Sequence, residues 1–202
     1  MNKTAPKNIV NTFSYDSYRK LVFDMADNNG STGEITEEHI SATKINAQWI
    51  KRIDKQAIVR EDIKKAVGSL KSKWNWIVII ESWCGDGAQN LPFIAKIAEQ
   101  SENINLKIIL RDENPEIIDA YLTNGSRSVP KLICCDAETD IELGIWGPRP
   151  EAIQKMVTEF KSNNPNVPHD EFIKNVHLWY SQDKGESFQE EFHKLITDWI
   201  NK

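Results

Sequence analysis

One cysteine in this chain stands where its sulfur could be activated. Cys84 follows the apolar run 76–80, WIVII, and precedes a stretch with helical character, in the sequence ESWCGDG at 81–87. At a helix N-terminus, unpaired backbone N–H groups and the helix dipole stabilise a thiolate and lower the thiol pKa. Such a thiolate can attack a disulfide and form a mixed disulfide. We therefore expect Cys84 to be the catalytic residue of a thiol reaction, with a pKa of ~7.5.

Two neighbouring carboxylates act against this activation. Glu81 and Asp86 flank Cys84, and negative charges near a thiolate raise its pKa. Asp86 also competes for the same helix dipole. An alternative therefore stays open, in which Cys84 is a small, partly buried residue on a scaffold that serves for binding.

The remaining candidates for chemistry point to structural roles. Cys134 and Cys135 are adjacent on an expected strand, where neighbouring side chains point to opposite faces. They should lie on the order of 13–17 Å along the strand from Pro130, too far to reach Cys84. The four histidines show no metal-binding spacing, so no metal site is expected.

Composition narrows the class of protein. The 202 residues carry a net charge of −5, which disfavours binding to nucleic acid or to an anionic membrane. No apolar run approaches the ~20 residues of a membrane span. The N-terminal residues 1–10 lack the apolar core of a signal peptide. We expect a cytoplasmic protein with reduced thiols.

The elements around Cys84 suggest three segments of one compact domain. Residues 1–73 look helical. Residues 74–162 alternate strand and helix in the order β-α-β-α-β-β-α, with an expected strand at 128–135 and with Asn114 as an expected helix cap. Residues 163–202 are expected to be a C-terminal helical extension, which opens with a connector at 163–168 and continues with two helices at about 169–181 and 187–201.

The central segment resembles the thioredoxin family. Trp83-Cys84-Gly85 matches the start of the family's active-site turn, and Pro92 matches the proline of the following helix. Val129-Pro130 matches the family's cis-proline, and Gly147 its glycine beside the active site. The resemblance implies an α/β thioredoxin-like fold with added N- and C-terminal helices. The helical N-terminus and the WCGD turn also resemble a branch of bacterial thioredoxin-like proteins.

The resemblance also implies a substrate groove at this turn. Its expected lining is Trp83, Gly85, Asp86, Gly87, Val129, Pro130 and Gly147. Trp83 should be partly exposed as a platform for a peptide, and Trp146 is expected to flank the same groove.

Departures from the family pattern limit the chemistry. Gly87 stands in place of the resolving cysteine, and Asp86 in place of the turn proline. Val78 and Ile108 occupy the positions of the family's buried aspartate and its accompanying lysine. The nucleophile and the cis-proline persist, whereas the second thiol and the groups that handle its proton do not.

Two functions remain open. The first is a thiol redox protein acting on a protein or peptide through Cys84 alone. By analogy with monothiol glutaredoxins, glutathione or another small thiol would be its co-substrate, and no other cofactor is expected. The alternative is a redox-inactive thioredoxin-fold module that binds a protein partner. The sequence does not set the oligomeric state.

Overall fold

The computed structural model describes residues 3–164 and 166–202. Met1 and Asn2 lie outside these ranges, as does Pro165 within the expected connector. The elements follow one another as α1 (Tyr15–Asp27), α2 (Glu37–Gln56), α3 (Glu61–Gly68), β1 (Trp74–Ile80), α4 (Gly85–Ala98), β2 (Ile104–Leu110), α5 (Pro115–Asp119), β3 (Lys131–Asp136), β4 (Glu142–Trp146), α6 (Glu151–Asn163), α7 (His169–Asp183) and α8 (Glu186–Ile200). From β1 to α6, this order confirms the expected alternation and the α/β class.

The four strands form one mixed sheet in the order β2-β1-β3-β4. β1 pairs parallel with β2 and antiparallel with β3, and β4 returns antiparallel to β3. The central strand β1 is almost entirely buried, as its continuous apolar sequence predicts for a strand covered on both faces. β3 begins at Lys131 rather than at Ser128, because Pro130 has no N–H to donate to a strand ladder.

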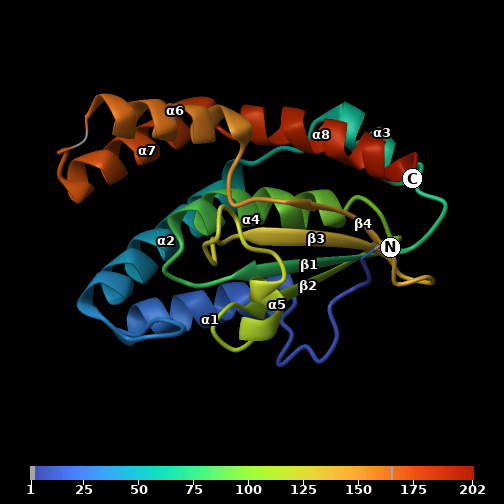
Figure 1. Ribbon diagram of the computed structural model, residues 1–202, viewed down its shortest axis with the longest axis horizontal. Coiled ribbons are helices and arrows are strands. Elements are labelled where there is room, and N and C mark those ends of the chain that lie inside the picture. Colours follow the sequence, from blue (N-terminus) through green and yellow to red (C-terminus); the bar gives the residue numbers. More distant parts are fainter. Residues whose placement is uncertain (1–2, 165) are drawn as a thin grey trace.

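Helices cover both faces of this sheet. In Figure 1, α4 and α8 lie above the strands and α5 lies below them. The main apolar cluster joins β1 to α4 and α8, and it includes Trp76, Leu91, Ile94 and Phe192. Trp76 meets Phe192 edge-on, with 5.5 Å between ring centroids. The C-terminal helix α8 is thereby part of the sheet's own core.

The first two helices of the N-terminal segment, α1 and α2, begin at side-chain caps. The Ser14 side chain accepts from the Ser17 N–H, and the Thr36 side chain accepts from the His39 N–H. Asn114, the expected cap of α5, makes no such bond. Its side-chain oxygen accepts from Val10 N–H at 2.8 Å, and its amide donates to the carbonyls of Val10 and Leu110. Asn114 therefore occupies the N-cap position directly before Pro115, as expected, but its side chain joins the N-terminal segment to the end of β2 instead of bonding the first turn of α5.

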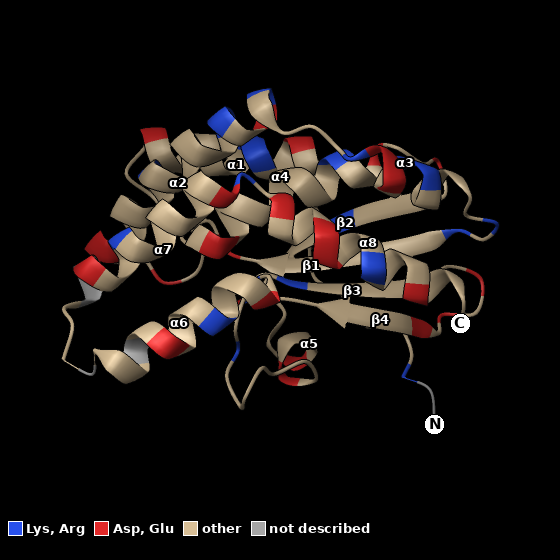
Figure 2. Ribbon diagram, turned by 90° about the horizontal axis from the view of Figure 1, so that it is seen from above, with Lys and Arg blue, Asp and Glu red and all other residues tan. Residues whose placement is uncertain are grey.

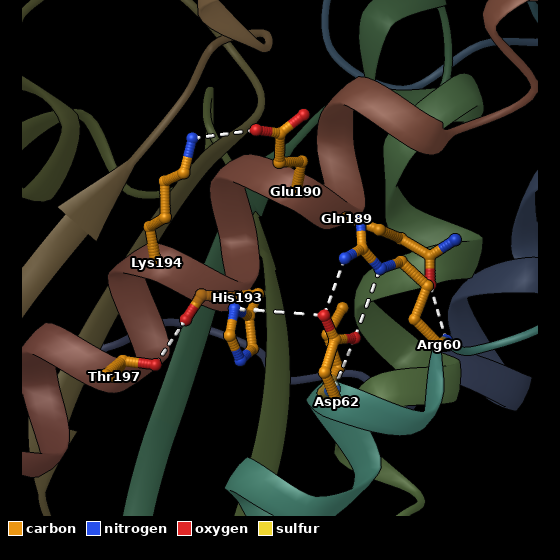
Figure 3. Close-up of polar contacts among 8 residues, drawn as sticks. Arg60, Asp62, Gln189, Glu190, His193, Lys194 and Thr197 are labelled. Carbon is orange, nitrogen blue, oxygen red and sulfur yellow. Dashed lines mark hydrogen bonds and ion pairs between the residues drawn. The ribbon is translucent and has the colours of Figure 1, made fainter.

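Polar contacts fasten α8 to α3 at the opposite side of the molecule from α5. The Arg60 N–H donates to the buried Gln189 side chain at 2.9 Å, and the Arg60 guanidinium pairs with Asp62 at 2.6 Å (Figure 3). His193 lies 4.0 Å from the same Asp62 carboxylate. The Gln189 and His193 contacts therefore link α8 to α3.

α6 and α7 form a helical hairpin with a small core of its own. Ile153 and Val157 on α6 pack with Phe172, Val176 and Tyr180 on α7, in a cluster separate from that of the sheet. Both helices lie at the left end of the molecule in Figures 1 and 2. The chain therefore leaves the sheet body after β4 and rejoins it at α8. None of the helices within the described ranges is long and apolar enough to cross a membrane.

Candidate functional site

Cys84 lies at the N-cap of α4, where β1 has just ended. Its Sγ accepts from the Gly87 N–H at 3.3 Å, and its thiol donates to the Val129 carbonyl oxygen at 3.1 Å. The Val129–Pro130 peptide bond is cis. Only 7% of Cys84 is exposed. The turn and the loop before β3 thus meet at the sulfur, as the sequence predicts.

The electrostatics of Cys84 differ from the expectation. The pKa of the Cys84 thiol is raised to about 12, chiefly by burial and in addition by the neighbouring Asp86, while the Gly87 N–H and Arg149 act to lower it. The expected pKa below the ordinary value was therefore wrong. A helix N-terminus stabilises a thiolate by a modest amount, and removal of water from around the sulfur outweighs it here.

Asp86 is committed to contacts within the chain. It forms an ion pair with Arg149, which follows β4, and it accepts from the Tyr180 hydroxyl of α7 at 2.8 Å. The Asn90 amide of α4 donates to the same hydroxyl at 3.1 Å. Burial raises the pKa of Asp86, and Arg149 opposes that rise. This residue, expected in the substrate groove, links α4, α7 and the loop after β4.

Gly87 faces the core. A Cβ at this position would lie 2.6 Å from Cδ1 of the fully buried Ile80. The space that a second cysteine would need is therefore occupied by the end of β1.

Trp83 is half-buried, in agreement with its expected partial exposure. His39 stacks on its ring at 4.6 Å between centroids, and the Arg111 guanidinium lies 4.8 Å from the ring centroid. The indole is therefore already held by two neighbours.

Trp146 does not flank this site. It is 3% exposed, packs against Phe188 and donates to Glu191 at 2.8 Å, because α8 covers β4.

A cleft of about 680 Å³ opens beside Cys84. α2 forms one wall and α7 contributes another, while the active-site turn and the loops before β3 and after β4 complete it. The lining side chains belong to all three segments of the chain: Glu38, Ala42, Ile45, Asn46 and Trp49; Trp83, Cys84, Gly85, Asp86, Arg111, Arg127, Ser128, Val129, Pro148 and Arg149; Ile173, Lys174 and His177. Trp49 and His177 meet edge-on across it, with ring centroids 4.2 Å apart.

Comparison with known proteins agrees with this architecture. The family model described as thioredoxin matches residues 33–161, well over half of the chain. The chain belongs to the thioredoxin family. A crystal structure of a Pseudomonas aeruginosa protein of unknown function has a TM-score of 0.51 at 17% identity, covering 94% of this chain and 96% of that one. An HIV epitope-scaffold has a TM-score of 0.49 at 16% identity, with the same coverage. No curated protein matches the chain.

Within this thioredoxin-family fold, two positions beside the Cys84 turn are apolar. Val78 and Ile108 face each other in the parallel register of β1 and β2, and both are fully buried. An apolar pair therefore fills the place of the family's aspartate and lysine. Gly147 has φ +109°, and a Cβ there would lie 2.2 Å from the Pro130 carbonyl oxygen. The glycine therefore permits the close approach of the loop after β4 to Pro130.

Behind Cys84 lies a buried polar network that the sequence analysis missed. The Ser82 hydroxyl accepts from the Thr32 N–H at 2.9 Å and lies 2.9 Å from the Thr43 hydroxyl, while the Asn46 amide donates to the Ser82 carbonyl. These bonds attach the turn before α2, and α2 itself, to the active-site turn. The thioredoxin motif gives no sign of these bonds. The one clue in the sequence is the polar pair Glu81-Ser82 directly after the apolar strand.

Glu81 belongs to the same region and is fully buried. One carboxylate oxygen accepts from the Asp112 N–H at 2.9 Å, and the other has no hydrogen-bond partner in the described part of the chain. Burial raises the pKa of Glu81. At this position the protonated form of the carboxyl group is favoured over the ionised form more strongly than it would be in water.

Cys134 and Cys135 lie within β3 and are fully buried free thiols. Burial raises the pKa of Cys135 to about 12 and raises that of Cys134 as well. They pair in register with Trp76 and Asn75, at the end of β3 remote from Pro130. Among the residues whose side chains the structure describes, no group of three or more His, Cys, Asp and Glu could hold a metal ion.

Proposed function

We propose that this thioredoxin-family protein is a redox-inactive module that binds a segment of a protein partner in the cleft beside Cys84. The observation that carries the proposal is the state of the sulfur. Cys84 is buried, donates to the Val129 carbonyl and has its pKa raised to about 12. With its pKa raised in this way, the sulfur is a thiol rather than a thiolate at pH 7. Ile80 fills the space of a second thiol at Gly87.

The cleft supplies what binding requires. Its walls come from α2 and α7 as well as from the thioredoxin turn, and its size suits a ligand of several side chains. We include in this proposal a cytoplasmic location, in which the three free thiols stay reduced. Glutathione is not a co-substrate under this reading.

Single-cysteine redox chemistry is the second candidate. It is favoured by the Gly87 N–H that donates to Cys84 Sγ, and by Arg149, which lowers the thiol pKa. In that reaction the Cys84 thiolate attacks a mixed disulfide and releases the substrate thiolate. An external thiol such as glutathione then attacks the new mixed disulfide, and the resulting disulfide leaves as Cys84 is regenerated.

The pH dependence of iodoacetamide alkylation separates the two. Mass spectrometry of the native protein reads Cys84 against Cys134 and Cys135 as internal controls. A binding module predicts slow alkylation of all three at pH 7, and no turnover of a glutathione mixed disulfide. Fast alkylation of Cys84 alone, with turnover that Cys84→Ser abolishes, would establish the redox function instead.

A further inference from the structure

We infer that the segment bound in this cleft is acidic, with carboxylates placed near Cys84 and an apolar side chain between α2 and α7; this rests on the proposed function. The whole chain carries a net charge of −5. The lining of the cleft, by contrast, has more cationic than acidic side chains. Four of its lining residues are cations, Arg111, Arg127, Arg149 and Lys174, and only two, Glu38 and Asp86, are carboxylates.

Aspartates outside the cleft pair with two of these arginines. Arg111 Nε donates to Asp112 at 2.7 Å, and Arg127 donates through Nε and a terminal nitrogen to both oxygens of Asp119. Neither aspartate lines the cleft, whereas both arginines do. The aspartates therefore hold the guanidinium groups in place, and the other terminal nitrogens lie outside these ion pairs. A guanidinium fixed in this way loses little freedom when it binds a second carboxylate.

Arg149 supplies a third, inner donor. It pairs with Asp86 through a terminal nitrogen, and its Nε is buried without a hydrogen-bond partner in the described ranges. That Nε is out of reach of the cleft, but the Arg149 side chain as a whole is 21% exposed, so a ligand carboxylate at the Asp86 end of the cleft could pair with its accessible part. Lys174 adds an exposed positive charge from α7.

The walls between these charges are apolar. Ala42, Ile45 and Trp49 line the α2 side, and Ile173 lines the α7 side. Ile45 is 44% exposed, although it is a large aliphatic residue. A small inorganic anion would leave this surface in water, whereas a peptide with both acidic and apolar side chains covers it. The combination favours an acidic peptide segment.

The test is fluorescence anisotropy with a short fluorescein-labelled peptide of alternating glutamate and leucine. The matched peptide carries glutamine in place of glutamate, and a third carries phosphoserine. Wild-type protein is expected to bind the glutamate peptide about tenfold more tightly than the glutamine peptide, as loss of a charge-assisted bond predicts. The preference should shrink as salt is added.

Arg127→Gln should weaken binding of the glutamate peptide about tenfold. Arg60→Gln is the matched control, because Arg60 also donates through Nε and a terminal nitrogen to one aspartate, outside the cleft (Figure 3). Circular dichroism of both variants checks that they remain folded. The control should bind as tightly as wild type.

Equal binding of the glutamate and glutamine peptides would overturn the acidic preference while leaving the binding module intact. No binding of either peptide, or binding of the phosphoserine peptide alone, would also overturn it. Equal weakening by Arg127→Gln and Arg60→Gln would also overturn it, because Arg60 lies outside the cleft. Failure of the proposed function has a separate signature, namely rapid alkylation and turnover at Cys84.

Discussion

The sheet body and the α6–α7 hairpin have separate apolar cores. In the body, one continuous apolar cluster joins β1, α4 and α8. The hairpin has a separate, smaller cluster around Ile153 and Val157. Beside the cleft it meets the body through the Tyr180 hydroxyl bond to Asp86 and through the edge contact of His177 with Trp49. The hairpin therefore contributes to the walls of the cleft, and we expect the body to provide most of the stability and the hairpin to limit access to Cys84.

The largest expected effect lies in the body. Ile94 on α4 is fully buried, and Ile94→Ala should destabilise the protein by about 2–5 kcal/mol, because it removes buried methyl groups and leaves a cavity. Urea denaturation followed by far-ultraviolet circular dichroism measures this loss. A change below the range would mean that the sheet core repacks around the missing atoms.

Ile153→Ala removes the same atoms from an equally buried site in the hairpin. Its local cost should also be about 2–5 kcal/mol, but confined to the hairpin, because that cluster is separate from the body. Hydrogen exchange should then quicken across α6 and α7, with the urea midpoint of the body little changed. If both isoleucine variants shift a single transition equally, the two regions unfold as one unit and the comparison fails.

The sequence captured the body better than the hairpin. The apolar run of β1, the cysteine turn and the proline before β3 were enough to predict the order of elements, because each depends on local pattern. Helix α7 was also expected. Nothing in its sequence predicted that Tyr180 reaches Asp86, since the two lie far apart along the chain and the bond depends on how the hairpin docks.

The reactivity of Cys84 was beyond local reasoning for the same reason. The residues beside it predicted a helix N-terminus, which the structure has. The pKa depends mainly on burial, which tertiary packing around the turn determines. Gly87 likewise appeared in the sequence as a missing cysteine, whereas its contact with Ile80 emerges only from the packing of α4 against β1.

A smaller effect is expected where the two regions meet. Tyr180→Phe removes the hydroxyl that bonds Asp86 and Asn90, which should weaken hairpin docking by about 1–2 kcal/mol and raise the alkylation rate of Cys84 about tenfold. The rate is measured at fixed pH by mass spectrometry. Tyr121→Phe is the matched control, because its buried hydroxyl donates to Glu142 at 2.8 Å elsewhere in the body. Equal alkylation rates in the two variants would show that the hairpin does not limit access to the sulfur.

The smallest expected effect tests a weak point inside the body itself. Burial raises the pKa of Glu81, so the folded protein retains this proton to higher pH than the unfolded chain does. Stability contributed by the protonated form is therefore lost as pH rises above the ordinary carboxyl value and through the folded pKa. Glu81→Gln cannot ionise, and its amide oxygen can still accept from the Asp112 N–H. The variant should gain about 1 kcal/mol over wild type at pH 7 and less at pH 4.

Urea denaturation across this pH range measures the difference, with the exposed Glu102→Gln as the control. A gain that is the same at both pH values would assign the effect to packing rather than to the charge. A gain that grows with pH, in Glu81→Gln alone, would show that a buried carboxylate behind Cys84 weakens the body at neutral pH. The sheet body would then owe its stability to apolar packing despite the buried Glu81 carboxylate. That result would sharpen its contrast with the α6–α7 hairpin.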